Sequence, residues 1–230
     1  MMFEILWTFD LFDNIKKKYN CISLCDDTYD FYKWIYYYNN INKKINCNYY
    51  KNNLDISNIN NIYTIIEKYK NIKMNLIMIN IKHNNDILKM QQLIFAQLLL
   101  TIFLWWINSN CIIKINYFNI IDKTDYFKSN NFIIWIIYYY YLWFKQIFLY
   151  IPSIWTKYGT FFIVCLNYYK KNSNTLFEQY NKFKLNDWLF TSFPIKFKNI
   201  INSFFIDIII NQNINLEKQH NIINYLDDSI

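Results

Sequence analysis

Residues Leu93–Ile107 read LIFAQLLLTIFLWWI and lie within twenty-four residues that carry no formal charge, between Lys89 and Lys114. A helix of about 20 apolar residues spans the hydrocarbon core of a bilayer. Trp105 and Trp106 stand where an interfacial aromatic belt is expected. We therefore predict a transmembrane helix at about residues 91–110. The alternative for this stretch is a helix buried inside a soluble protein.

A second apolar segment, Phe132–Trp155, is the other candidate membrane span. It begins FIIWII and continues through four consecutive tyrosines, Tyr138–Tyr141. Lys145 interrupts it, and a charge at the centre of a membrane helix costs about 2.5–3.5 kcal/mol on insertion scales. We expect this lysine to snorkel, to pair or to face a subunit interface, unless the span ends at Phe144. The predicted span covers about residues 132–151.

Together these segments predict an α-dominated membrane protein built on a helical hairpin of one or two transmembrane helices. Three regions follow: a polar and aromatic matrix-side or surface region over 1–90, the hairpin over 91–155, and a C-terminal surface and interaction region over 156–230. Within the first region, helical spacing of apolar residues is followed by a short strand pattern over 76–81. With one Gly and two Pro, the chain must use Asn at its turns and helix caps.

The overall composition indicates an extremely AT-rich genome. Thirty-five Asn, forty-three Ile and twenty-four Lys stand against one Ala, one Val and no Arg, so codons containing G or C are avoided. Eight Trp fit a mitochondrial code in which UGA also encodes Trp, and seven Gln argue against the ciliate nuclear code. In composition, over its whole length and without any motif, the chain resembles the orphan reading frames of ciliate mitochondrial DNA. This resemblance implies a mitochondrial protein from a genome that encodes mainly respiratory-chain and ribosomal components.

Several kinds of chemistry are excluded or disfavoured by the residues present. A single Gly excludes both the phosphate-binding P-loop and the dinucleotide fingerprint. The two histidines, His83 and His220, lie in polar surroundings that do not suit haem ligation. Cys21 and Cys25 have a spacing that could share a helical face, but no further Cys or His completes a zinc site. We expect no catalytic residue, no bound cofactor and no metal.

These observations favour a non-catalytic structural subunit of a mitochondrial inner-membrane respiratory complex, acting in assembly and electron transport. By family analogy, cytochrome c oxidase and NADH dehydrogenase rank first. The expected partners are other subunits of the complex and membrane lipids, and a membrane-bound assembly factor is a third possibility. The candidate functional or interface residues are Gln97, Trp105, Trp106 and Lys145.

The alternative from a different class is a mitochondrial ribosomal protein that binds rRNA and neighbouring proteins. It predicts that Lys16–Lys18, Lys43, Lys44 and Lys51 face RNA, that Trp and Tyr stack on unpaired bases, and that Leu93–Ile107 is a buried helix. Three features count against it: a net charge of only +7, the absence of Arg, and the long uncharged stretch.

Overall fold

A computed structural model describes residues 2–12, 19–24, 30–41, 47–52, 54, 56, 58–80, 87–116, 126–151, 160–169, 194–207 and 210. The helices are α1 Met2–Thr8, α2 Asp30–Ile41, α3 Ile59–Tyr69, α4 Ile87–Leu104, α6 Tyr126–Tyr141 and a helix over 195–207. The strands are β1 Tyr19–Leu24, β2 Cys47–Asn52, β3 Met74–Asn80, β4 Trp105–Asn116, β5 Phe144–Tyr150 and β6 Thr160–Tyr168.

These strands form one six-stranded mixed sheet in the order β2-β1-β3-β4-β6-β5. The first four strands are parallel, whereas β6 pairs antiparallel with both β4 and β5. The chain enters the sheet at β1, next to the edge, moves outward to β2, and then returns past β1 to β3 and β4. This reversal of direction defines a doubly wound α/β fold.

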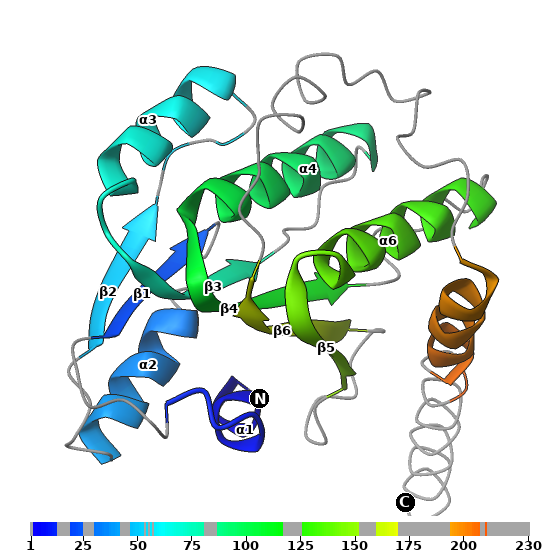
Figure 1. Cartoon of the computed structure of the whole chain (residues 1–230), viewed down its shortest axis with the longest axis horizontal. Coiled ribbons are helices and arrows are strands. Elements are labelled where there is room, and N and C mark those ends of the chain that lie inside the picture. Colours follow the sequence, from blue (N-terminus) through cyan, green and yellow to red (C-terminus); the bar gives the residue numbers. More distant parts are fainter. Residues whose placement is uncertain are drawn as a thin grey trace, which may run out of the picture.

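Helices cover both faces of the sheet and bury two separate cores (Figure 1). The larger core joins α3, α4 and α6 to one face, where the helix over 195–207 also packs through Phe205. The smaller core joins α1 and α2 to the opposite face through Ile5, Leu6, Phe31 and Ile35. The helices on either side of β2 in the chain, α2 and α3, lie on opposite faces, as right-handed crossovers in opposite directions require.

The predicted membrane hairpin is wrong, because each predicted span crosses a junction between a helix and a strand. The first span leaves α4 at Leu104 and continues as β4 from Trp105. The second leaves α6 at Tyr141 and continues as β5 from Phe144. Among the residues described, no helix is long and apolar enough to cross a membrane. The α-dominated, transmembrane and inner-membrane description is therefore replaced by a mixed α/β sheet with covering helices.

Burial in a three-layer fold explains why these segments carry so few charges. Leu98, Leu99 and Leu100 of α4 are buried, and neighbouring β4 residues Ile112 and Ile113 are buried in different cores. A central strand covered on both faces has no solvent side, so its sequence is a continuous apolar run rather than an alternating one. The buried helix α4 continues directly into the apolar start of β4, where Trp105 is buried and Trp106 and Ile107 are exposed, so the combined run has the apolar length of a membrane span.

Other predictions from the sequence are confirmed. The helical pattern forms α3, and the strand pattern after it forms β3. Asn58 takes the capping role expected of Asn, since it accepts a hydrogen bond from the Asn60 N–H at 2.9 Å at the start of α3. Asn108 and Asn167 adopt positive φ angles of 67° and 61°, but they lie within strands β4 and β6 and not at turns. The expectation that Cys21 shares a helical face is wrong, because Cys21 lies in β1.

Candidate ligand-binding groove between α2 and β2

The structure distributes the four candidate residues from the sequence over different environments. Gln97 lies on α4 with 3% of its side chain exposed, and its Oε1 has no hydrogen-bond partner within the described part of the chain. Trp105 begins β4 in a buried aromatic cluster, with its ring centroid 4.6 Å from that of Phe144. Trp106 is 37% exposed, and Lys145 is exposed on the edge strand β5. No common site is formed by these four residues.

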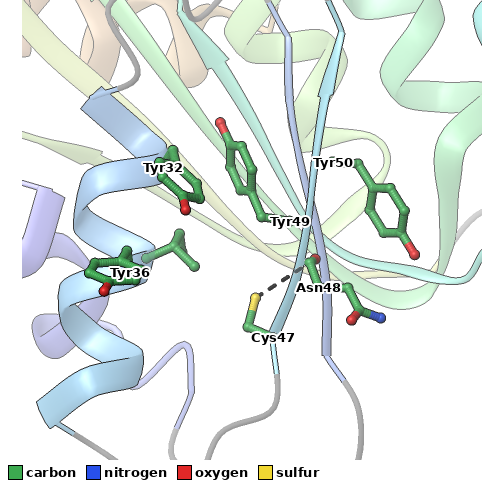
Figure 2. A pocket seen from close by; sticks show the side chains of 7 residues that line it. Tyr32, Tyr36, Cys47, Asn48, Tyr49 and Tyr50 are labelled. Carbon is green, nitrogen blue, oxygen red and sulfur yellow. Dashed lines mark hydrogen bonds between the residues drawn. The ribbon is translucent and has the colours of Figure 1, made fainter.

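A groove between α2 and the edge strand β2 is the better candidate site (Figure 2). It encloses about 500 Å³. Its lining combines residues of the helix with residues from both faces of the strand: Tyr32, Ile35, Tyr36, Cys47, Asn48, Tyr49 and Tyr50. Most of these side chains are aromatic, so the groove offers large flat surfaces together with hydroxyl and amide groups.

The helical spacing of α2 determines which side chains reach the groove. Phe31 and Ile35 are buried in the smaller core and fix the inner face of the helix. Tyr32 directly follows Phe31 and Tyr36 directly follows Ile35, so the two tyrosines lie together on the flank of the helix next to its buried face. Figure 2 shows the Tyr32 ring on the side of α2 towards Tyr49, and the Tyr36 ring over the helix, one turn further along. Their centroids are 6.1 Å apart, and that of Tyr32 is 5.1 Å from Tyr49 on the strand.

Side-chain alternation along β2 places its residues on the two sides of the sheet. Tyr49 faces α2, and its hydroxyl lies 2.5 Å from the Ser23 hydroxyl of β1. Tyr50 faces the other way and packs against the larger core, with its ring 5.7 Å from that of Tyr69 on α3. Asn48 donates a hydrogen bond through Nδ2 to Asn20 Oδ1 at 2.9 Å. These contacts hold the strand side of the groove in a defined position.

One lining residue, Cys47, has a second thiol beside it, that of the buried Cys21, which does not line the groove. The Sγ atoms of Cys21 and Cys47 are 3.1 Å apart, and both cysteines are free. Burial raises the pKa of the Cys21 thiol well above its ordinary value, and the neighbouring Cys47 raises it further. Cys21 is therefore a neutral thiol at physiological pH, which does not favour nucleophilic or metal-binding roles. Within the described ranges, no group of three or more His, Cys, Asp or Glu side chains is arranged to hold a metal.

Other proposed chemistry lies elsewhere or outside the described residues. In doubly wound folds ligands bind beyond the carboxyl ends of the parallel strands, where the strand order reverses. Here that edge follows β1 and β3, but residues 25–29 and 81–86 lie outside the described ranges, as does His83. The same holds for His220 and for the basic residues Lys16–Lys18, Lys43 and Lys44.

The tyrosines that line the groove follow a local pattern in the sequence. Tyr32 and Tyr36 are spaced as neighbours on one helical flank, and Tyr49 and Tyr50 form a second pair in β2. What the sequence did not indicate is that β2 ends the sheet and packs beside α2. Without the packing of β2 beside α2, nothing in the sequence places the tyrosines of the helix close to those of the strand.

Comparison with known proteins adds no functional assignment. No protein family matches the chain, and no curated protein matches its sequence.

Proposed function

We propose that this chain is a non-catalytic protein of the mitochondrial ribosome, which packs on rRNA and on neighbouring proteins. The observation that carries the proposal is the burial of α4. The uncharged stretch was one of the three features against an rRNA-binding role, and from Leu93 to Leu104 it lies in a helix packed on a sheet. The ribosomal alternative predicts a buried apolar helix here. The respiratory alternative was favoured by a predicted membrane span, and that prediction was wrong.

The outer surface of α2 supports RNA contact. Lys33 and Tyr37 lie on the side of the helix opposite its buried residues, and both are exposed, Tyr37 to 58%. Trp7 is also exposed, on α1, which contributes to the same core as α2. A cation beside exposed rings can bind phosphate while the rings stack on unpaired bases. The net charge of +7 is smaller than a dense basic surface would give, but its sign attracts a polyanion.

The decisive experiment follows the native protein through a gradient of mildly solubilised mitochondria, with magnesium kept high enough to preserve ribosomes. Quantitative mass spectrometry should find the chain in the fractions that contain rRNA. After magnesium is removed with EDTA, it should move with one dissociated ribosomal subunit, because loss of magnesium weakens RNA folding. Migration with a respiratory complex under both conditions would refute the proposal and would identify the chain as a respiratory subunit.

A second experiment tests the RNA-binding surface directly. Tyr37→Ala should weaken binding of the purified chain to a single-stranded RNA oligonucleotide about 10-fold, because stacking on one base contributes about 1–3 kcal/mol. Lys33→Gln should reduce the slope of log affinity against log salt by about 0.7, the value for one phosphate contact on a single strand. Tyr63→Ala on α3 is the matched control, since Tyr63 is similarly exposed at 47% on the other side of the sheet.

A further inference from the structure

We propose that β2 binds an extended peptide segment of a partner protein as an additional strand, with one large apolar side chain of that peptide seated in the groove between α2 and β2. The inference is independent of the ribosomal proposal. It requires a partner polypeptide but does not specify the assembly to which that partner belongs.

The outer edge of β2 is the first argument. Among the described strands, β2 stands at the end of the sheet and pairs with β1, in a register that runs unbroken from Tyr19↔Cys47 to Leu24↔Asn52. Alternate residues of such an edge strand direct their N–H and C=O groups away from the sheet, where another strand can pair with them. Pro and a bulge are two of the features that protect edge strands, and β2 contains neither; its one charged residue is Lys51.

The groove beside this edge is the second argument. When a peptide adds to a sheet edge, its backbone provides affinity and pockets for its alternate side chains provide specificity. Tyr32 and Tyr36 form the helical wall of the groove, and Tyr49 closes its inner side. The volume of about 500 Å³ accommodates a large side chain and adjoining backbone. Its place between a helix and an edge strand allows both interactions at once.

The chemistry of the groove favours a peptide over the other occupants. Outward N–H and C=O groups are complemented by a polypeptide that repeats its own donors and acceptors about every 3.3 Å, and a polynucleotide has no such repeat. Among the described residues that line the groove none is acidic, Lys33 is exposed next to Tyr32, and the whole chain carries +7. We therefore expect the peptide to place acidic residues beside one aromatic or large aliphatic residue.

A selection experiment tests this inference on the purified full-length chain. Random dodecapeptides displayed on phage are selected against the natural chain and, in parallel, against the Tyr32→Ala/Tyr36→Ala variant. Enriched peptides are then synthesised in two forms, one unmodified and one N-methylated at alternate amides. The methyl groups remove backbone donors but keep every side chain. Affinities are measured by fluorescence anisotropy.

The expected result has three parts. Selected sequences should alternate apolar and acidic residues, N-methylation should weaken binding at least 10-fold, and Tyr36→Ala should weaken binding about 10-fold. Tyr63→Ala is the matched control, because Tyr63 lies on α3 with similar exposure, 47% against 53%, and does not line the groove. Its affinity for the peptide should not change. Thermal unfolding of each variant confirms that it is folded.

Four results would overturn the inference. The first is that no sequence is enriched on the natural chain over the double variant, and the second is that the N-methylated peptides bind as tightly as the unmodified ones. The third is that single-stranded RNA displaces the peptides from the groove. The fourth is that the chain forms concentration-dependent dimers that exclude the peptide. The third would assign the groove to nucleobases, and the fourth to a second copy of this chain. None of them bears on migration with rRNA, so failure here is distinguishable from failure of the ribosomal proposal.

Discussion

At the scale of single residues, Ser109 illustrates how one side chain joins two strands. It is buried in β4, where its Oγ accepts a hydrogen bond from the Trp106 N–H at 2.9 Å and donates one to the Met74 carbonyl oxygen of β3 at 2.6 Å. Ser109→Ala removes both bonds and leaves their backbone partners without this hydroxyl. We expect the free energy of unfolding to fall by about 2 kcal/mol, measured by urea denaturation.

The control for this change is Ser203→Ala, on the exposed side of the helix over 195–207. A surface substitution of this kind should stay within about 0.5 kcal/mol of the natural chain. Equal stability of the two variants would show that the Ser109 hydroxyl does not stabilise the irregular register between β3 and β4, which shifts between Met74 and Leu76.

At the scale of elements, α4 is the helix on which the membrane and globular interpretations differ. Leu99 is fully buried in the core that joins α4 to the sheet. Leu99→Ala should lower the free energy of unfolding by about 3 kcal/mol, through lost apolar contact and the cavity that remains. Leu54→Ala is the matched control, because Leu54 is 42% exposed, and it should change stability by about 0.5 kcal/mol or less. Urea unfolding of both variants measures the difference, and equal losses would show that α4 does not pack on this sheet.

Sequence periodicity predicted some elements and failed for others for one physical reason. α3 lies at the surface, so its buried residues Ile62 and Ile65 alternate with exposed ones at helical spacing, and the helix was predicted correctly. α4 and the adjoining start of β4 are apolar with little variation around their axes. A continuous apolar run does not distinguish a buried helix, a central strand and a membrane span. The groove was missed because it depends on the place of β2 in the sheet, which no local pattern determines.

At the scale of the whole molecule, the buried hydroxyl and thiol groups give the fold a defined response to alkali. Burial raises the pKa of Tyr19 and Tyr140 well above 10.0 and that of Cys111 and Cys165 well above 9.0. Burial also raises the pKa of Tyr168, to about 12. Above about pH 9 the unfolded chain therefore releases protons that the folded chain retains.

Because the unfolded state then binds fewer protons than the folded state, stability must fall as pH rises. We expect the midpoint of thermal unfolding to be insensitive to these groups below about pH 8, where they are protonated in both states, to begin to fall as the unfolded thiols ionise near pH 9, and to fall steeply from about pH 10 towards 12. Circular dichroism melts across this range measure the effect. Tyr140→Phe should make the fall less steep, whereas Tyr63→Phe, at an exposed position, should leave it unchanged. A midpoint that stayed constant to pH 12 would show that these side chains ionise as readily in the folded chain as in the unfolded one, which is incompatible with the two buried cores.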